Sequence, residues 1–130
     1  MKERGGRIET KIIPNVQTAT LRPIVLDSVE KGSTVSTDEL AAYKLLKDYG
    51  YVHGAVDHSR GEYAWKDRAS GTTYSTNGTE SFWKLFKDSI NGTHIHISSK
   101  HLDRYLGEFS FRSNFRQMRN AMFDLLIAAL

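Results

Sequence analysis

The first half of the sequence alternates between short stretches typical of strands and longer stretches with the apolar spacing of helices. Apolar and polar residues alternate over residues 7–13, and three of the four residues 34–37 are β-branched, so both segments are predicted to be strands. Apolar residues recur at helical spacing over residues 18–30 and again over residues 38–50, where a glycine ends the pattern. Residues 51–56 predict a further strand.

The second half of the sequence predicts one long loop followed by helices. Glycines and hydroxyl residues fill residues 66–79, which indicates a loop, and a strong amphipathic helix follows over residues 79–90. Residues 98–108 and 113–130 predict two more helices, separated by residues 109–111. Because strands alternate with helices along the chain, we expect an α/β fold with a sheet flanked by helices.

Length and composition fit one ordinary globular domain. The chain has 130 residues, of which 39% are hydrophobic and 25% charged. This length can bury one core and is too short for two domains with a linker, so we expect residues 1–130 to form a single domain. The 18 Lys and Arg against 15 Asp and Glu give a mild basic excess of +3. Without cysteine, disulfide frameworks, thiolate zinc sites and cysteine nucleophiles are excluded.

The sequence predicts neither a membrane segment nor a signal peptide. The longest apolar run, residues 125–130, is far shorter than the roughly 20 residues that a membrane helix needs. The residues directly after Met1 are charged or glycine. We therefore expect the protein in the cytosol.

Acidic residues follow the predicted strand at residues 34–37, where a strand gives way to a helix. Asp38 and Glu39 stand at this point, and the carboxyl ends of strands are where α/β sheets place their sites. Asp38 is therefore a candidate functional residue. The pattern fits a structural role as well, in which Ser36 and Glu39 form a capping box and Asp38 favours the start of the helix electrostatically. The sequence pattern leaves both interpretations open.

The predicted helix at residues 79–90 has a charged face and an apolar face. The charged face carries Glu80, Lys84 and Lys87, with Glu80 roughly 10 Å from Lys87 along the helix axis. A carboxylate beside two ammonium groups suits a metal ion next to a phosphate backbone. Alternatively, Asn77 and Glu80 cap the helix and the charged face is only solvated. The apolar face comprises Phe82, Leu85, Phe86 and Ile90.

Basic residues outnumber acidic ones in the last third of the chain. Between residues 84 and 119, seven lysines and arginines stand against three acids, and aromatic residues are interleaved with them. This pattern is typical of nucleic-acid binding, although aromatics at such a spacing are more often core residues. The basic residues are Lys84, Lys87, Lys100, Arg104, Arg112, Arg116 and Arg119.

Three histidines, His94, His96 and His101, could be drawn as a metal site. Histidines at this spacing on an extended segment, with no cysteine and no nearby carboxylate, are usually packing or surface residues. A zinc site is therefore not expected.

Five motifs follow one another along the chain. They are Thr37-Asp38-Glu39-x-x-Ala42-Tyr43, His53-x-x-Val56-x-His58-Ser59-x-Gly61-Glu62-Tyr63, Thr76-Asn77-Gly78-x-Glu80-Ser81-Phe82-Trp83 with Lys87, Gly92-Thr93-His94-x-His96-x-Ser98 and Lys100-His101-Leu102-x-Arg104-Tyr105-x-x-Glu108-Phe109-x-Phe111-Arg112-x-Asn114-x-Arg116. Together they resemble the catalytic domain of DDE-type insertion-sequence transposases, in the ISXO-like branch. Each motif alone would be weak, and the resemblance rests on five of them in the right order.

This resemblance implies an RNase H-like fold, in which a mixed sheet flanked by helices gathers three acids around two divalent cations, Mg²⁺ or Mn²⁺. The implied function is metal-dependent cleavage and transfer of DNA strands during insertion-sequence transposition. Asp38 matches the second catalytic acid and Glu80 the third, so both are expected to be metal ligands. Lys87 matches the residue that holds the DNA end, and Asn77 is a candidate ligand from the same motif.

DNA, as element ends and as target, is the partner that the resemblance implies. Together with the basic pattern, it leads us to expect DNA contacts from Lys84, Lys87, Arg104, Arg112 and Arg116. Asp57 adds an acid at the end of the second inferred strand and could rival Glu80 as a metal ligand.

In the family that the chain resembles, the first catalytic acid stands on the first strand of the sheet, ahead of the strand that residues 7–13 resemble. No residue before Asp38 matches that acid. We therefore expect the chain to begin inside the domain, without its first strand. The alternative function is a catalytically inactive DNA-binding remnant of a transposase. An unpaired sheet edge could be covered by a second copy, so a homodimer is also considered. The family implies the cytosol of a bacterium or archaeon.

Overall fold

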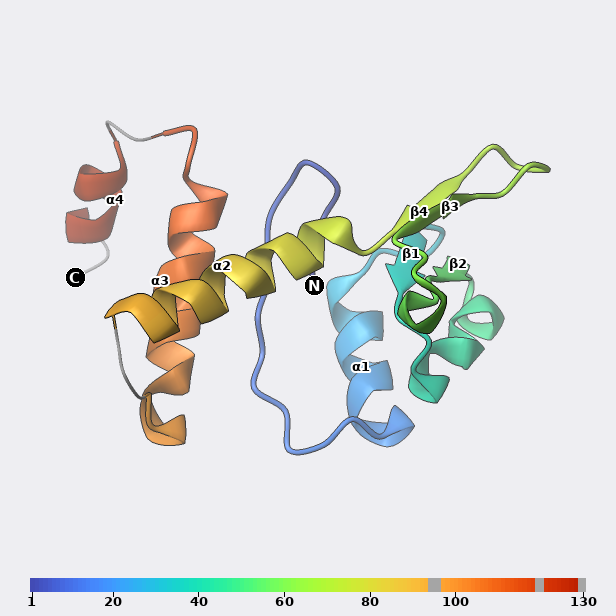
Figure 1. The fold of residues 1–130 in the computed structure, drawn as a ribbon, viewed down its shortest axis with the longest axis horizontal. Coiled ribbons are helices and arrows are strands. Elements are labelled where there is room, and N and C mark those ends of the chain that lie inside the picture. The colour runs from blue at the N-terminus through green and yellow to red at the C-terminus, as the bar shows by residue number, and fades with distance from the viewer. Residues whose placement is uncertain (94–96, 119–120, 129–130) are drawn as a thin grey trace. The chain divides into compact units, whose positions relative to one another are not determined.

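The computed structural model describes residues 1–93, 97–118 and 121–128, which belong to two compact units (Figure 1). One unit comprises Ile13–Asn77, and the other comprises Met1–Ile12 together with Gly78–Leu130. Each unit has buried apolar residues of its own.

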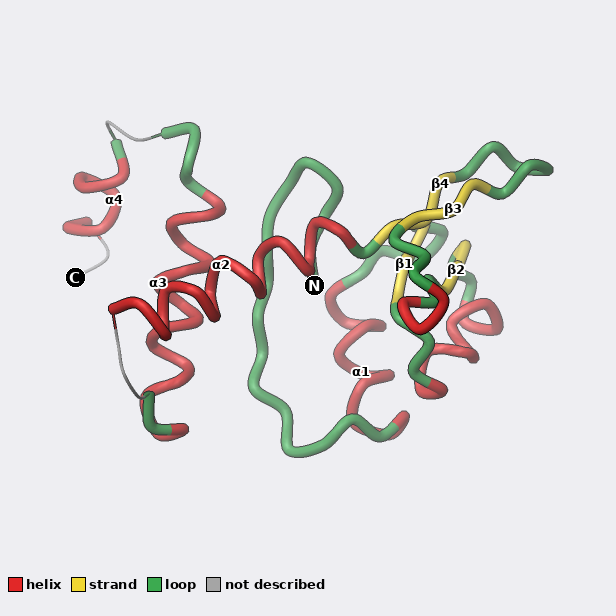
Figure 2. Tube along the Cα trace, in the orientation of Figure 1, coloured by secondary structure: helices red, strands yellow, loops and turns green. Residues whose placement is uncertain are grey.

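The Ile13–Asn77 unit contains all the strands of the described chain (Figure 2). Its elements are α1 (Thr18–Ser28), β1 (Thr34–Thr37), the 3₁₀ helix η1 (Ala41–Tyr49), β2 (Val52–Ala55), the 3₁₀ turn η2 (His58–Arg60), β3 (Ala64–Lys66) and β4 (Thr73–Ser75). The other unit is helical. Its elements are α2 (Asn77–Thr93), the 3₁₀ turn η3 (Ser99–His101), α3 (Leu102–Asn114) and α4 (Met122–Ala128). The boundary between the units falls just after Asn77, the first residue of α2.

Strands β1 and β2 pair in parallel, and this pairing positions the candidate site. The register runs from Thr34 opposite Val52 to Thr37 opposite Ala55. The ladder continues one step further, because the Val56 amide donates to the Thr37 carbonyl oxygen at 2.8 Å. In a parallel pair both carboxyl ends lie at the same edge, so the residues that follow β1 and β2 are brought together.

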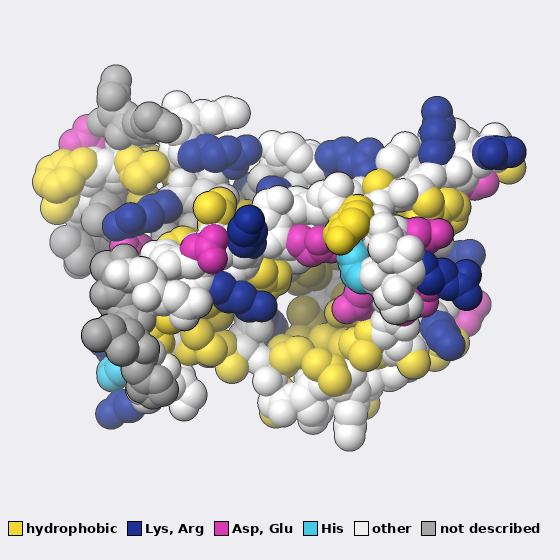
Figure 3. Space-filling view, in the orientation of Figure 1, with side chains coloured by type: hydrophobic (Ala, Val, Ile, Leu, Met, Phe, Trp, Pro, Cys, Tyr) yellow, Lys and Arg dark blue, Asp and Glu magenta, His cyan; other side chains and the backbone are white. Residues whose placement is uncertain are grey.

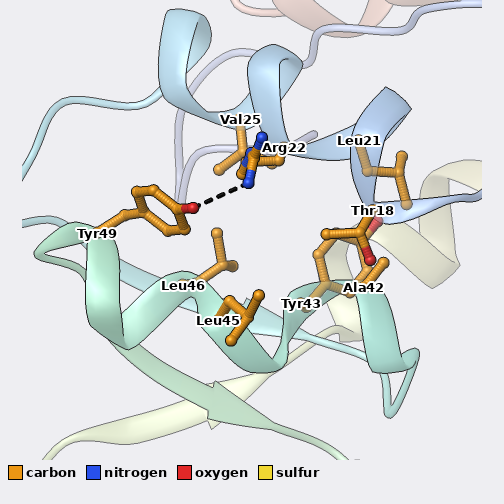
Figure 4. A pocket seen from close by; sticks show the side chains of 9 residues that line it. All are labelled: Thr18, Leu21, Arg22, Val25, Ala42, Tyr43, Leu45, Leu46 and Tyr49. Carbon is orange, nitrogen blue, oxygen red and sulfur yellow. Dashed lines mark hydrogen bonds between the residues drawn. The ribbon is translucent and has the colours of Figure 1, made fainter.

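Helix α1 packs against η1 through a small apolar core. Val25, Leu46 and Tyr51 are buried there. Figure 4 shows the groove between the two helices, where the Arg22 guanidinium donates a 2.9 Å hydrogen bond to the Tyr49 hydroxyl. None of the residues that line this groove is acidic, so it contains none of the candidate metal ligands.

The antiparallel β3–β4 hairpin is held against β2 by aromatic packing. The buried Tyr74 ring lies against Gly54, where an added methyl group would come within 2.4 Å of the ring. Trp65 stacks on Tyr74 with 4.6 Å between ring centroids, and its indole N–H donates to the Ala55 carbonyl oxygen at 2.8 Å. Glycine is therefore required at position 54 by close packing rather than by backbone conformation.

Aromatic side chains form the core of the helical unit. Phe82 and Phe86 of α2 are buried, and the Phe86 ring meets that of Phe109 in α3 edge to face at 5.1 Å. Ile8 is also buried in this unit. Its amide donates to the Asn114 side-chain oxygen at 2.6 Å, and the Asn114 amide group donates to the Ile8 carbonyl oxygen at 2.9 Å.

Most of the elements predicted in the first half are confirmed. The segments predicted as strands at residues 34–37 and 51–56 contain β1 and β2, and residues 18–30 contain α1. The helix predicted over residues 38–50 is a 3₁₀ helix that begins at Ala41, with the expected glycine at its end in the left-handed conformation. The structure thus confirms a mixed α/β fold.

Residues 7–13 do not form the predicted strand. Apart from an isolated bridge between Lys2 and Ile8, this segment pairs with no other strand in the described chain. The alternating pattern was misleading because the Asn114 side chain, 106 residues away, satisfies the peptide groups of Ile8 that a neighbouring strand would otherwise bind.

The loop predicted over residues 66–79 was also wrong, since it contains the end of β3, all of β4 and the start of α2 at Asn77. Asp67 builds the turn of the hairpin. Its carboxylate accepts hydrogen bonds from the Ala69 amide at 3.1 Å and from the Ser70 hydroxyl at 2.6 Å. Aspartate often closes turns in this way, so a polar stretch can hide a hairpin.

The break predicted at residues 109–111 is not found, because α3 continues through them. Ser110 is buried and lies 3.1 Å from the Thr10 hydroxyl, so a polar residue inside the helix is satisfied by a distant segment. The helix predicted at residues 98–108 begins as η3 and continues as α3, and within residues 113–130 the described part contains the end of α3 and α4.

The described strands form two sheets of two strands each. The RNase H-like sheet, the single domain and its missing first strand therefore stay predictions. Among the helices of the described ranges, none has the length and apolar character to cross a membrane.

Replacing Gly54 by alanine should destabilise the fold, because the new methyl group would overlap the buried Tyr74 ring. We expect a loss of about 1–3 kcal/mol in the free energy of unfolding, measured by urea denaturation. Gly107→Ala is the matched control. A methyl group at this helical position meets no atom within 4 Å, so the same change should stabilise by about 0.5–1 kcal/mol. Equal effects of the two variants would contradict the described packing.

Candidate active site

Asp38 lies at the carboxyl end of β1 with its side chain exposed. Its carboxylate accepts a hydrogen bond from the Leu40 amide at 3.2 Å. The predicted capping box of Ser36 and Glu39 is wrong, because Ser36 belongs to β1 and its hydroxyl accepts from the Ser75 amide at 3.3 Å. That contact places β4 beside β1. Asp38, two residues further along, remains exposed to solvent.

Asp57 occupies the equivalent place after β2. Its carboxylate accepts from the Ser59 hydroxyl at 2.5 Å and from the Arg60 amide at 3.2 Å, and it forms a 3.0 Å ion pair with the Arg60 guanidinium. The hydrogen bond from Ser59, with smaller contributions from Glu39 and from backbone amides, lowers the pKa of Asp57. Asp57 therefore holds η2 in place as a charged carboxylate.

Glu39 shares this edge and hydrogen-bonds with Asp57. The bond to the Asp57 carboxylate is the largest cause that raises the pKa of Glu39 above 4.5. As the pH falls, Glu39 therefore takes up a proton before Asp57 does. From the sequence, Glu39 is predicted only as a capping residue. The pairing of β1 with β2 gives it this second contact.

The segment that leads into α2 is bound to the same edge. The Thr76 hydroxyl lies 2.9 Å from Nε2 of His58, the residue after Asp57. Asn77 follows directly and is already helical, so the predicted role of Asn77 as the cap is wrong; its amide donates to the Ser75 hydroxyl at 3.2 Å. Asn77 therefore starts its helix close to the residues that follow β2.

Glu80 lies in the first turn of α2 and is partly buried. The helix is unbroken from Asn77 to Thr93, so Lys84 and Lys87 share the face of Glu80 at one and two turns' distance, and both are exposed. The opposite face agrees with the prediction at Phe82 and Phe86. It differs at Leu85, whose side chain is 65% exposed and does not reach the core.

The basic residues predicted in α3 are at the surface, but they are not equally available. Arg104 is exposed, whereas Arg112 forms a 2.6 Å ion pair with Glu108 and the Arg116 guanidinium donates to the Ser113 carbonyl oxygen at 2.7 Å. The interleaved aromatics Phe109, Phe111 and Phe115 are partly buried against other rings, as the core interpretation expects. His94, His96 and Arg119 lie outside the described residues.

The donors at this edge suit a divalent cation, although the described residues of neither unit contain a full set of ligands. Carboxylate oxygens such as those of Asp38, Glu39 and Asp57 are the ligands that Mg²⁺ and Mn²⁺ prefer. Within residues 1–93, 97–118 and 121–128, no group of three or more His, Cys, Asp or Glu side chains could hold a metal ion. Glu80 belongs to the helical unit and Asp38 to the strand-containing unit.

Comparison with known proteins decides the family. Residues 1–114 match the ISXO2-like transposase domain. The chain belongs to the ISXO2-like transposase family. A transposase-like protein from Haemophilus influenzae, itself uncharacterized, is 31% identical to this transposase domain over 117 residues, which cover 88% of this chain and 86% of the relative. No solved structure matches the chain.

The family match confirms the resemblance and spans Asp38, Asp57, Asn77 and Glu80. It also includes Lys84, Lys87, Arg104 and Arg112, while Arg116 lies just beyond the matched residues. The individual roles of these residues stay predictions. What the sequence missed are the contacts that depend on strand pairing, namely Glu39 with Asp57 and Thr76 with His58.

The raised pKa of Glu39 is directly measurable. Asp57→Ala should return the raised pKa of Glu39 to about its ordinary value, because the group that accepts its hydrogen bond is gone. The measurement is a ¹³C NMR titration of the side-chain carboxyl carbons. Asp48→Ala, which removes an exposed acid of η1 that does not affect Glu39, should leave the titration of Glu39 unchanged. An ordinary pKa of Glu39 in the unaltered protein would show that the contact is absent.

Proposed function

We propose that this transposase domain cleaves and joins DNA strands during insertion-sequence transposition, with Asp38 and Glu80 as its catalytic, metal-binding acids. The observation that carries the proposal is the family match over residues 1–114, which includes both acids. The local geometry supports it. Asp38 is exposed at the carboxyl end of a parallel strand, where α/β folds place their sites. Glu80 lies in the first turn of a helix whose charged face continues with Lys84 and Lys87.

The proposed cofactor is Mg²⁺ or Mn²⁺, held by Asp38 and Glu80, with Asn77 and Asp57 as further candidate ligands. Asp57 is the weaker candidate because its carboxylate is already bound by Ser59 and Arg60. Divalent cations at such a site supply positive charge to the phosphate being attacked and to the leaving oxygen.

The chain's own cations are proposed to bind and orient the DNA. Lys84 and Lys87 are exposed on the face of Glu80, so their ammonium groups can bind phosphates on either side of the cleaved bond. Arg104 and Arg116 are also exposed in the helical unit, over which Figure 3 shows Lys and Arg side chains at the surface. Arg112 must exchange its ion pair with Glu108 for a phosphate, so we expect the smallest contribution from it. The proposed setting is the cytosol, with a homodimer as a further possibility.

A second candidate function is DNA binding without catalysis. It is favoured by one observation: in the parts of the chain that the structure describes, no three His, Cys, Asp or Glu side chains gather as a metal site. The basic helical surface would still bind DNA, with an affinity that falls steeply as the salt concentration rises.

The proposal predicts that Asp38→Asn abolishes Mn²⁺-dependent nicking of supercoiled plasmid DNA, because the neutral amide cannot replace a charged ligand. Nicking is followed as conversion of supercoiled to open-circular plasmid on a gel, and circular dichroism checks that the variant folds. The matched control is Asp48→Asn, which changes an exposed acid on η1 that is not among the candidate ligands and should keep normal nicking.

Unchanged nicking by Asp38→Asn would overturn the catalytic assignment. If the unaltered chain binds plasmid DNA in a salt-dependent manner but never nicks it, the non-catalytic binding function replaces the proposed one.

A further inference from the structure

A buried hydrogen bond joins the two parallel strands just before Asp38. Nε2 of His53 in β2 lies 2.8 Å from the hydroxyl oxygen of Thr37 in β1, and the two residues are only 8% and 9% exposed. The same hydroxyl donates to the carbonyl oxygen of Asp38 at 2.8 Å. The contacts therefore form a chain from the buried ring to the backbone of the candidate acid.

The chemistry of a hydroxyl group fixes the direction of this chain. Thr37 has a single hydroxyl proton, and the bond to the Asp38 carbonyl oxygen uses it. The hydroxyl oxygen can then only accept from the ring, so Nε2 of His53 must carry a proton and donate it. Burial lowers the pKa of His53, which agrees with a neutral ring that carries one proton.

We propose that His53 is a positioning residue for Asp38 and acts through the Thr37 hydroxyl. This inference rests on the proposed function. The hydrogen bond from the Thr37 hydroxyl fixes the backbone of Asp38 at its carbonyl group. The Leu40 amide donates to the Asp38 carboxylate itself. Such supporting hydrogen bonds orient ligands, and their loss typically weakens metal affinity or activity by about tenfold to hundredfold.

The location of the pair supports a positioning role over simple packing. An apolar side chain at position 53 would fill the space between the strands without having to satisfy a buried ring N–H. The His53 ring instead binds the Thr37 hydroxyl, which in turn binds the backbone of the exposed Asp38. Each bond constrains the next group, so the ring helps to orient Asp38.

The test compares variants that break the hydrogen bonds from His53 through Thr37 to Asp38 with variants that keep them. His53→Leu and Thr37→Val each remove one member, and each should weaken Mn²⁺ binding, measured by calorimetry, and slow plasmid nicking by about tenfold to hundredfold. The double variant should be no worse than either single one, because both changes break the same connection. His53→Gln and Thr37→Ser keep a donor or a hydroxyl and should restore most of the affinity.

Tyr51→Phe is the control for loss of a buried hydrogen bond. The Tyr51 hydroxyl donates to the Val29 carbonyl oxygen at 2.8 Å, at the other end of the same sheet from Asp38. Its removal should lower the melting temperature but keep the Mn²⁺ affinity and the nicking rate. In the same samples, ¹⁵N NMR of the His53 ring should show the tautomer protonated at Nε2.

Two results would overturn the inference: a His53 ring protonated only at Nδ1, or normal Mn²⁺ affinity and nicking in Thr37→Val while Asp38→Asn loses both. If His53→Leu fails to fold, the Thr37→Val and His53→Gln variants decide. If Asp38→Asn itself keeps Mn²⁺ binding and nicking, the proposed function fails and the role of His53 falls with it.

Discussion

The parallel pairing of β1 with β2 is the constraint on which the rest of the candidate site depends. Its register sets Thr37 opposite Ala55, and the added bond from the Val56 amide to the Thr37 carbonyl oxygen extends it to the point where both strands end. Val56 is completely buried, so a slip of one residue would turn a core side chain outward. Only in this register do the acids that follow the two strands meet, and only then can His53 reach the hydroxyl of Thr37.

The β3–β4 hairpin that follows packs against the β1–β2 pair. Tyr74 packs on Gly54 and the Ser75 amide binds the Ser36 hydroxyl, so β4 ends beside the strands that carry the acids. The chain then enters α2, whose first turn carries Asn77 and Glu80. The β1–β2 pair thus brings together the acids that follow its strands, and β4 leads the chain into the helix that carries Glu80.

The sequence predicted this organisation where local pattern was sufficient. β1, β2 and α1 each have a clear periodicity, and the left-handed Gly50 marks the end of η1 as expected. Prediction failed where distant groups satisfy the backbone: Asn114 replaces a partner strand at Ile8, and Thr10 satisfies Ser110 inside α3. The hairpin escaped because β3 is exposed throughout and has no alternation to detect.

The candidate acids could be named from sequence motifs, and the family match places both within an ISXO2-like transposase domain. Their surroundings could not be predicted. The contact between Glu39 and Asp57 and that between His53 and Thr37 join residues 18 and 16 positions apart, and they exist only because two strands pair in one register. A motif identifies residue types along the chain, whereas the influence of one carboxyl group on the pKa of another depends on how strands meet in space.

The central claim is that Asp38, at the carboxyl end of β1, binds a divalent cation. Paramagnetic line broadening in ¹H–¹⁵N NMR spectra, with Mn²⁺ added well below one equivalent, tests it most directly. The account predicts that the amide signals around Asp38 broaden, that they recover when a chelator is added, and that Asp38→Asn abolishes the effect. No broadening around Asp38, or equal broadening in Asp38→Asn, would contradict it.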